Sequence, residues 1–247
     1  MNDHTLAAEY INAGYNHKTI LSDVSVTIPK NKISVILGAN GCGKSTLLKT
    51  FARLLAPQSG QMILDGKNVS EIPSRQMAKM LGLLPQSPVV PEGIRVMDLV
   101  SRGRFPYRQF LKSMTREDYA AVEEAMEIMG ITELADRAVE ELSGGQRQAL
   151  TLLMASLQKP QLLLLDEHTA ALDPKTAAKV LALTEKIIAE HHLTAMMVTH
   201  NMKDAIAHGN RLIMMHEGRV IYDISGEEKK NLKVSDLLAK FEEVSGG

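Results

Sequence analysis

A chain of 247 residues is long enough to form one large domain or two small ones and to bury a hydrophobic core. Its 28 basic and 29 acidic residues nearly balance, so charge gives no argument for nucleic acid or an anionic membrane surface as a partner. The single cysteine, Cys42, excludes an internal disulfide and fits a reducing compartment. No apolar run approaches the roughly 18 residues of a membrane span, and the N-terminus lacks the pattern of a secretion signal. These features predict a cytosolic protein.

The first third of the chain has the short apolar runs and turn residues that are typical of β-strands. Strands are expected within residues 5–37, ending in the β-branched run 33–37, and again over 61–66. A helix-prone segment over 47–55 separates the last two strands, and the apolar residues of 77–84 lead into a strand end.

The middle of the chain has a helical pattern instead. Helices are expected over 96–100, 116–129 and 145–157. The second helix follows Thr115 and carries Asp118 three residues later, an arrangement that resembles a capping box.

Strand character returns with 161–165, a fully apolar run that is typical of a central strand in a parallel sheet. The other expected elements are strands over 194–199, 210–216 and 219–222 and helices over 174–190, 202–207 and 234–244. This alternation predicts an α/β sheet with an inserted helical block.

A glycine-rich stretch, Gly38-Ala39-Asn40-Gly41-Cys42-Gly43-Lys44-Ser45-Thr46, follows an apolar strand and precedes a helix. This is the context that the G-x-x-x-x-G-K-[ST] pattern requires. Gly41 and Gly43 let the backbone curl, so that its N–H groups and the helix N-terminus face phosphate oxygens. Lys44 is expected to reach the β- and γ-phosphates, and Ser45 to supply a hydroxyl to Mg²⁺. The alternative, a glycine-rich turn that ends in lysine by chance, is disfavoured by the flanking elements.

Two carboxylates, Asp166 and Glu167, follow the apolar strand over 161–165. The carboxyl ends of such strands are where α/β proteins bind ligands. Asp166 is expected to hold Mg²⁺ through a water molecule, and Glu167 to polarise an attacking water as general base. His200 ends the strand over 194–199 and is placed to hydrogen-bond the γ-phosphate and the backbone region of Glu167. Acids in such a turn are often only solvated, but the phosphate loop upstream favours the catalytic interpretation.

A second phosphate-binding helix N-terminus begins at Leu142-Ser143-Gly144-Gly145-Gln146, where a serine and two glycines open a helix. One nucleotide does not obviously need two such helices in one chain. The economical interpretation is that this helix completes the site of a second copy. Two copies packed head to tail then bury two nucleotides between them.

The chain resembles the nucleotide-binding subunit of an ABC transporter in six motifs, which are Gly38–Ser45, Gln86, Leu142–Gln146, Leu162–Glu167, Ala171-Leu172-Asp173 and His200. The motifs stand in the family's order and span nearly the whole chain. The resemblance implies one ATPase domain over 1–247, with an α/β, RecA-like P-loop NTPase core and an N-terminal antiparallel β-subdomain formed by 1–86 and 159–247. An α-helical subdomain over 87–158 is inserted into it.

The resemblance also implies ATP and Mg²⁺ as cofactors and assigns roles to residues. Tyr15 is expected to stack on adenine, and Gln86 to link the γ-phosphate and the metal to a transmembrane partner. Ser143, Gly144 and Gly145 are expected to act across the dimer, and Asp173 to communicate between the two sites. The implied nucleotide-binding set is Tyr15, Gly38, Asn40, Gly41, Cys42, Gly43, Lys44, Ser45, Thr46, Gln86, Ser143, Gly144, Gly145, Gln146 and Asp173; the metal set is Ser45, Gln86 and Asp166; the catalytic set is Lys44, Glu167 and His200.

The implied partners are a second copy of the chain, in an ATP-dependent head-to-tail dimer, and permease subunits that dock on Gln86 and the helical subdomain. No nucleic acid is expected. Such a subunit is cytoplasmic and peripheral to the inner face of the plasma membrane. Soluble ABC-type ATPases of translation or DNA repair are a rival class, but they usually carry a second cassette, a long coiled-coil insertion or a basic extension that this sequence lacks.

Within the family, residues 15–148 resemble importers of iron-siderophore, haem and cobalamin complexes. From about residue 149 the sequence departs from that branch, with Ala149 where arginine is usual and His168 where proline is usual. Leu165–Thr176 resembles ATPases linked to amino-acid-type or uncharacterised binding proteins instead. Two interpretations stay open: a natural divergent subunit, or an engineered chimera joined within 147–160 that keeps fold and nucleotide binding but has no native permease.

His168 carries a separate expectation. Proline at this position would rigidify the turn after Glu167, whereas histidine is expected to loosen the turn or to add a pH-sensitive group near the site.

Overall fold

A computed structural model describes residues 4–86, 91–108, 112–128, 130–157 and 160–246 of the chain. The chain divides into two compact units. Unit 1 consists of Met1–Ile72, Leu164–Glu167 and His192–Gly247, and unit 2 of Pro73–Leu163 and His168–His191. These bounds differ from the expected division around 87–158, part of which lies outside the described residues, and that division stays a prediction. No helix within the described ranges has the length and apolar character that crossing a membrane requires.

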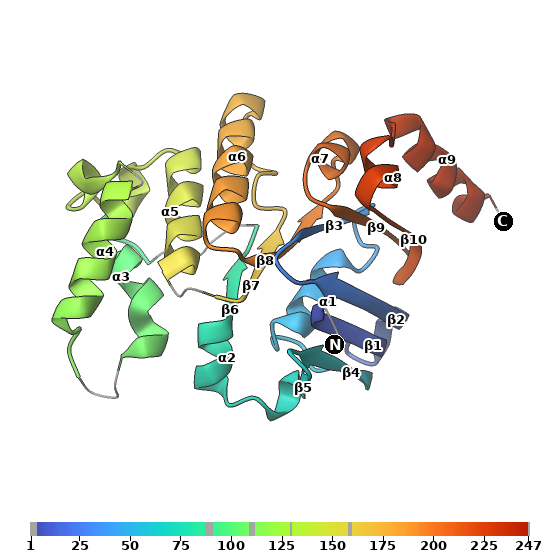
Figure 1. The fold of residues 1–247 in the computed structure, drawn as a ribbon, viewed down its shortest axis with the longest axis horizontal. Helices are drawn as coiled ribbons and strands as arrows, with labels where there is room; N and C mark the ends of the chain where they lie inside the picture. Colours follow the sequence, from blue (N-terminus) through green and yellow to red (C-terminus); the bar gives the residue numbers. More distant parts are fainter. Residues whose placement is uncertain (1–3, 87–90, 109–111, 129, 158–159, 247) are drawn as a thin grey trace. The chain divides into compact units, whose positions relative to one another are not determined.

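Unit 1 begins with an antiparallel sheet in the order β2-β1-β4-β5 (Figure 1). Its strands are β1 (His4–Tyr15), β2 (Lys18–Pro29), β4 (Ser59–Leu64) and β5 (Lys67–Asn68). Alternate side chains of β2, such as Val24, Val26 and Ile28, are buried because successive side chains of a strand point to opposite faces. The expected N-terminal β-subdomain is confirmed.

The second sheet of unit 1 has the order β10-β9-β3-β8-β7. Its strands are β3 (Ile33–Gly38), β7 (Leu162–Asp166), β8 (Thr194–Thr199), β9 (Arg211–His216) and β10 (Arg219–Ser225). β3 runs parallel to β8 and β9, whereas β10 pairs with β9 as an antiparallel hairpin. The central strands are almost wholly buried, as continuous apolar runs in parallel sheets are. The first two residues of β7 belong to unit 2.

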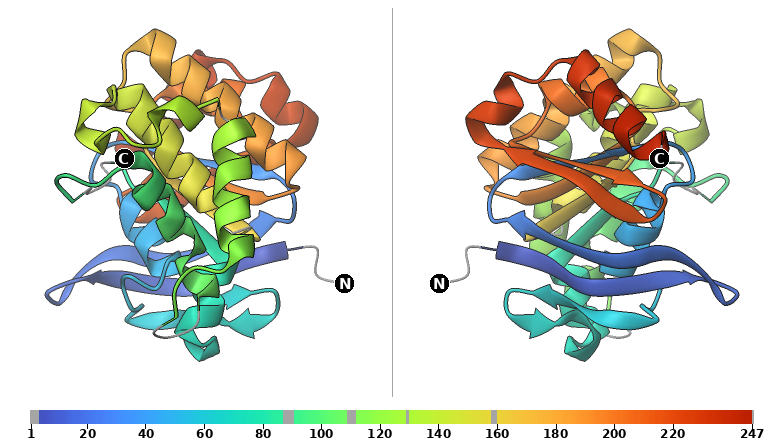
Figure 2. Two further views of the ribbon diagram at one scale, coloured as in Figure 1. Left: turned by 90° about the vertical axis from the view of Figure 1, so that its left-hand side faces the viewer. Right: turned by 90° about the vertical axis from the view of Figure 1, so that its right-hand side faces the viewer.

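The helices that the structure describes in unit 1 are α1 (Lys44–Phe51), α7 (Met202–Ala207), α8 (Gly226–Lys230), α9 (Val234–Ser245) and a 3₁₀ turn, η1 (Val69–Glu71). α1 is the next element after β3, and the loop 39–43 connects the two. Figure 2 shows the β9–β10 hairpin with α8 and α9 beside it. The fold therefore brings the carboxyl end of β3 and the N-terminus of α1 to one loop.

Unit 2 is mainly helical. Its described elements are α2 (Ser74–Met80), β6 (Leu81–Leu84), α3 (Val96–Ser101), η2 (Arg102–Tyr107), α4 (Arg116–Ile128), η3 (Thr132–Leu134), η4 (Val139–Glu141), α5 (Gly144–Leu157) and α6 (Pro174–Glu190). Val100, Val122, Met126 and Leu150 are buried in one apolar core, because α3, α4 and α5 turn their apolar stripes toward one another. Met126 is therefore a core residue of this unit.

Most expected elements are confirmed within one or two residues, β10 runs to Ser225, three residues past its expected end, and three other segments need correction. α1 begins at Lys44 and ends at Phe51, rather than covering 47–55. The apolar stretch 77–84 is divided between the end of α2 and the whole of β6. α8 occupies a segment for which no element was expected. These errors fall on helices of eight residues or fewer, in which apolar periodicity has little length to repeat.

Candidate functional site

The loop between β3 and α1 turns through glycines in conformations that side chains disfavour. Gly41 has φ +82° and Gly43 has φ +105°, and Gly43 immediately precedes the first residue of α1. Gly38 is needed for close approach, since a Cβ there would lie 2.4 Å from Cys42 Sγ and 2.5 Å from the carbonyl oxygen of Met215. The loop therefore curls as the motif predicts and ends on a helix N-terminus, where anions bind favourably.

Lys44 is the first residue of α1 and is buried, with 4% of its surface exposed. Its Nζ donates hydrogen bonds to the carbonyl oxygens of Gly38 and Ala39 at 2.9 and 3.0 Å. The same Nζ lies 3.5 Å from Glu167 Oε1, and the Glu167 side chain is 12% exposed. The lysine of the phosphate loop and the proposed general base thus form an ion pair inside unit 1.

Ser45 and Asp166 also meet in unit 1. The Ser45 hydroxyl donates to Asp166 Oδ1 at 2.9 Å, which joins the start of α1 to the end of β7. Burial raises the pKa of the Asp166 carboxyl, the neighbouring Glu167 charge adds to the rise, and the hydrogen bond from Ser45 opposes it. Among the described residues, no cluster of three or more His, Cys, Asp or Glu side chains could hold a metal alone. A hydroxyl with one carboxylate fits Mg²⁺, which takes few protein ligands and completes its shell with phosphate and water.

Glu167 follows the last residue of β7 with φ +44°. Its N–H donates to the carbonyl oxygen of Val198 in β8 at 3.1 Å, so the carboxyl ends of these strands lie together. Glu167 Oε2 lies 3.1 Å from Nδ1 of His200, whose side chain is 50% exposed. Glu167 is therefore held between a buried lysine and a histidine that reaches solvent. No sequence pattern predicted the contact between Glu167 and Lys44, because 123 positions separate the two residues.

Other predicted residues of unit 1 lie around this loop. Asn40 and Gly41 are exposed, whereas Cys42 and Thr46 are buried. Burial raises the pKa of the Cys42 thiol, and the nearby Lys44 charge partly opposes this rise. The Cys42 thiol is therefore a small packing group rather than a reactive one.

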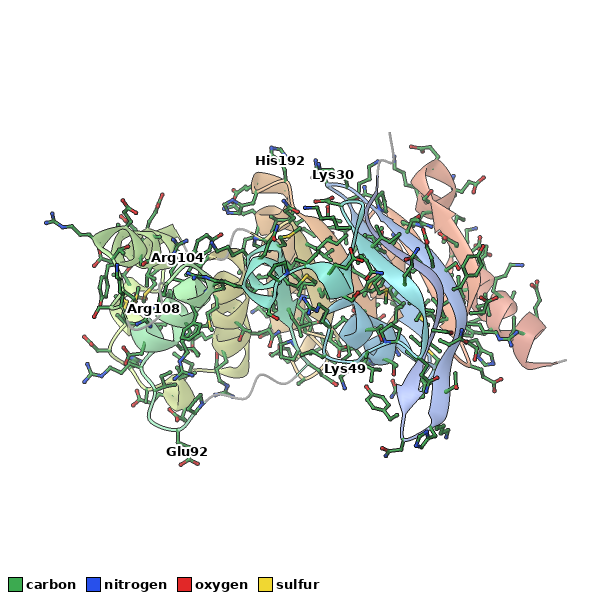
Figure 3. The ribbon with its side chains drawn as sticks, turned by 90° about the horizontal axis from the view of Figure 1, so that it is seen from below. Lys30, Lys49, Glu92, Arg104, Arg108 and His192 are labelled. Carbon is green, nitrogen blue, oxygen red and sulfur yellow. The ribbon has the colours of Figure 1, made fainter. Side chains whose placement is uncertain are left out.

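Tyr15, at the end of β1, presents a ring that is 40% exposed. Nζ of Lys49, on α1, lies 6.0 Å from the centroid of that ring; Lys49 is labelled in Figure 3. An exposed ring held near α1 is available for stacking, and a neighbouring ammonium group adds positive charge for phosphates. No sequence pattern pointed to Lys49.

The remaining predicted residues belong to unit 2. Ser143 and Gln146 form a reciprocal capping box at the start of α5: the Ser143 N–H donates to Gln146 Oε1 at 2.9 Å, and the Gln146 N–H donates to Ser143 Oγ at 3.3 Å. Asp173 Oδ1 caps α6 by accepting the N–H groups of Lys175 and Thr176, both at 3.1 Å. A hydrogen bond from the Thr176 side chain, together with those from the N–H groups of Thr176 and Lys175, lowers the pKa of the Asp173 carboxyl.

Gly144, Gly145 and Gln86 complete the set of predicted residues in unit 2. Gly144 is exposed, and Gly145 packs so closely on α6 that a Cβ would lie 2.3 Å from Cγ2 of Thr176. Gln86 is exposed, two residues beyond the end of β6.

His168 is the residue for which a looser turn or a pH-sensitive group is expected. Only 3% of its surface is exposed, and its Nε2 lies 3.2 Å from Oγ1 of Thr184 on α6. Both residues belong to unit 2. The histidine is a buried, hydrogen-bonded group, and its effect on the turn and on pH sensitivity stays a prediction.

Comparisons with known proteins show which family the chain is similar to. The family described as ABC transporter matches residues 21–170. The iron(3+)-hydroxamate import ATP-binding protein FhuC of Bacillus subtilis (strain 168) is 38% identical over 218 residues, which are 88% of this chain and 81% of the relative. The tyrosine transport ATP-binding protein of Clostridioides difficile (strain R20291) is 39% identical over 234 residues and covers 91% of each chain.

A solved structure shows the same fold. CbiO1 from Clostridium perfringens, part of the ABC transporter complex cbiONQ, matches with a TM-score of 0.82 at 27% identity, over 98% of this chain and 95% of that chain. Because single relatives cover about nine-tenths of the chain, they extend across residues 147–160. The comparisons give no support to a chimera joined there.

Proposed function

The chain belongs to the ABC transporter family as an ATP-binding subunit, and from this premise we propose that two copies close around two Mg²⁺·ATP and power a membrane permease. The observation that carries the proposal is the convergence of Lys44, Ser45, Asp166, Glu167 and His200 within unit 1. A phosphate loop, a metal-binding pair and a histidine-supported carboxylate are the parts that phosphoryl transfer to water requires.

Lys44 and the N–H groups at the start of α1 bind the phosphates. The Ser45 hydroxyl and the Asp166 carboxylate, 2.9 Å apart, would hold Mg²⁺, which would supply positive charge against that of the phosphates. Tyr15 stacks on the adenine ring, and the loop residues Gly38–Thr46 enclose the triphosphate.

Glu167 acts as general base toward the attacking water. His200 Nδ1, 3.1 Å from Glu167 Oε2, orients this carboxylate, and its exposed ring contacts the γ-phosphate. Glu167 Oε1 faces Lys44 at 3.5 Å, so the base lies on the side of the site where the phosphates bind. Proximity of base, water and phosphate supplies much of the rate enhancement in such reactions.

The second copy contributes Ser143, Gly144, Gly145 and Gln146. In the capping box, Ser143 Oγ accepts a hydrogen bond from the Gln146 N–H, which leaves its own proton to donate to a phosphate of the facing copy. The exposure of Ser143 and Gly144 agrees with such a contact. Asp173 communicates between the two sites, and Gln86 with the surface of 87–158 meets the permease.

The transported substrate is proposed from the relatives and from the resemblance of one segment of the sequence. Relatives such as FhuC favour import of a metal-chelate compound of the siderophore class, at the cytoplasmic face of a membrane. A second candidate is an aromatic amino acid, because the tyrosine transport relative covers a larger share of both chains, 91% each. The resemblance of Leu165–Thr176 to amino-acid-linked ATPases favours the same candidate.

The decisive experiment is steady-state ATP hydrolysis by the purified chain over a range of protein concentrations, beside Glu167→Gln. We expect the parental rate to rise faster than linearly with protein concentration, because the active species is a dimer. Glu167→Gln should bind ATP, accumulate as a dimer and fail to turn over. A Glu167→Gln protein that stays monomeric in saturating Mg²⁺·ATP would contradict the proposal.

A further inference from the structure

The residue after Glu167 forms a directed chain of hydrogen bonds into α6. His168 Nε2 lies 3.2 Å from Thr184 Oγ1, and the Thr184 hydroxyl donates to the carbonyl oxygen of Val180 at 2.8 Å. A hydroxyl has a single proton, which Thr184 gives to Val180. His168 Nε2–H must therefore be the donor, and Thr184 Oγ1 the acceptor. His168 is therefore the hydrogen-bond donor whether its ring is neutral or charged.

Thr184 is the polar member of an otherwise apolar stripe. The other buried residues of α6 are Val180, Leu181, Ile187 and Ile188. Thr184 itself is 2% exposed. A buried hydroxyl is unfavourable unless it is hydrogen-bonded, and valine has nearly the same shape. A valine at position 184 would fill the same space but could not accept the hydrogen bond from His168.

Glu167 needs support on both sides because its backbone is strained. Its φ of +44° lies in the left-handed region, which residues with a Cβ rarely adopt. Such conformations persist only where the surrounding structure holds them. On the N-terminal side of Glu167, its own N–H donates to the carbonyl oxygen of Val198 at 3.1 Å. On the C-terminal side, the next residue, His168, is buried and hydrogen-bonded to Thr184.

The helix that carries Thr184 is itself fixed. Asp173 caps its N-terminus, and Thr176 packs on Gly145 of α5, where there is no room for a Cβ. α5 and α6 lie side by side in unit 2 (Figure 1). Thr184 is thus an anchor on a rigid element, not on a loop.

We propose that the His168–Thr184 hydrogen bond positions Glu167 for hydrolysis. The two residues are positioning residues, because they act through the turn and not on ATP. The inference rests on the proposed role of Glu167 as general base. Proline would restrict such a turn through its ring; in this chain a side-chain bond to a neighbouring helix has that task.

The test uses Thr184→Val, which keeps the shape of the side chain and removes the acceptor. We expect kcat for ATP to fall about fivefold to tenfold while KM changes less than about twofold, because the loss affects base geometry and not phosphate binding. Thr184→Ser keeps the hydroxyl and should recover most of the rate. Thr50→Val is the matched control, since Thr50 is equally buried on α1 and donates to the carbonyl oxygen of Thr46 at 2.8 Å.

Separate outcomes test the two levels of the argument. No hydrolysis by the parent chain would refute the proposed function. Parental hydrolysis, with Thr184→Val and Thr50→Val equal in kcat, would refute the positioning role alone. If Thr184→Val does not fold, His168→Gln and His168→Leu replace it. Glutamine keeps an N–H donor and should retain kcat, whereas leucine should lower it with KM unchanged; equal rates would overturn the proposal.

Discussion

The Arg104–Asp118 pair in unit 2 provides a quantitative test of how the helical region is stabilised. Asp118 is 5% exposed, and its Oδ1 accepts a hydrogen bond from Arg104 Nε at 2.9 Å. Its Oδ2 accepts bonds from the N–H and the hydroxyl of Thr115 at 3.1 and 2.9 Å, which caps α4. One carboxylate therefore serves both a buried ion pair and a helix cap. Arg104 is labelled in Figure 3.

Asp118→Ala should destabilise the protein by about 3 kcal/mol. The lost bonds from the N–H and the hydroxyl of Thr115 account for about 1 kcal/mol, and the lost charge-assisted bond to Arg104 for about 2 kcal/mol. Arg104 keeps a hydrogen bond to the carbonyl oxygen of Leu157 at 3.3 Å and stacks 4.2 Å from the Tyr107 ring centroid. These remaining contacts hold the cost below the upper end of the range for broken buried pairs.

Thermal unfolding is the assay. For a chain of this size, about 3 kcal/mol corresponds to a fall in Tm of roughly 6–12 °C. Asp136→Ala is the control, because Asp136 forms a 3.3 Å pair with Arg95 in which the side chains are 92% and 63% exposed. Exposed pairs contribute little, so this variant should melt with the parent. An Asp118→Ala protein that melts within about 1 °C of the parent would refute the reasoning.

The same pair predicts a pH dependence. Burial raises the pKa of Asp118, but hydrogen bonds from Thr115 and Arg104 outweigh burial and leave the pKa below its ordinary value of 3.8. A carboxyl whose pKa is lower in the folded state stabilises that state fully above the ordinary pKa. The contribution is lost as the pH falls through the folded value. The Tm difference between parent and Asp118→Ala should therefore be complete at neutral pH and shrink in acid.

Two further predictions concern close packing. Gly145→Ala places a Cβ 2.3 Å from the Thr176 methyl group, so it should lower the free energy of unfolding by about 1–3 kcal/mol. Thr176→Ser in the same chain removes that methyl group and should restore most of the Tm. Cys42 is 6% exposed with a raised thiol pKa, so a maleimide at pH 7 should label the native chain at least about tenfold more slowly than the unfolded chain; equal rates would contradict the assigned burial.

The parts of the fold that sequence predicted are those with local causes. α4 begins where Thr115 and Asp118 predicted a cap, and α6 has the expected bounds because Pro174 and Asp173 define its start. α2 was missed because it has seven residues, and its N-terminus has no side-chain cap hydrogen bond. Local patterns predict elements only where the signal repeats over several turns.

The site divides in the same way. The loop, the two acids and His200 follow from motif and strand-end rules, and the structure brings them together in unit 1. The partners that give them their geometry do not follow, because Lys49 beside Tyr15 and Thr184 beneath His168 depend on distant packing. Histidine in place of the usual proline suggested a looser turn, because the sequence shows that the proline ring is missing. It does not show that Thr184 lies close enough to accept a hydrogen bond from His168.

Under the proposed function, the contacts of Lys44 link phosphate binding to the availability of Glu167 as base. Lys44 Nζ donates hydrogen bonds to the carbonyl oxygens of Gly38 and Ala39 and forms an ion pair with the Glu167 carboxylate. The two carbonyl contacts, at 2.9 and 3.0 Å, are shorter than the 3.5 Å contact with Glu167. A γ-phosphate that binds Lys44 therefore competes first with Glu167, and its negative charge repels the carboxylate as well. We expect Glu167 Oε1 then to be released toward water while Oε2 keeps its contact with His200, so that binding of the substrate frees the proposed base.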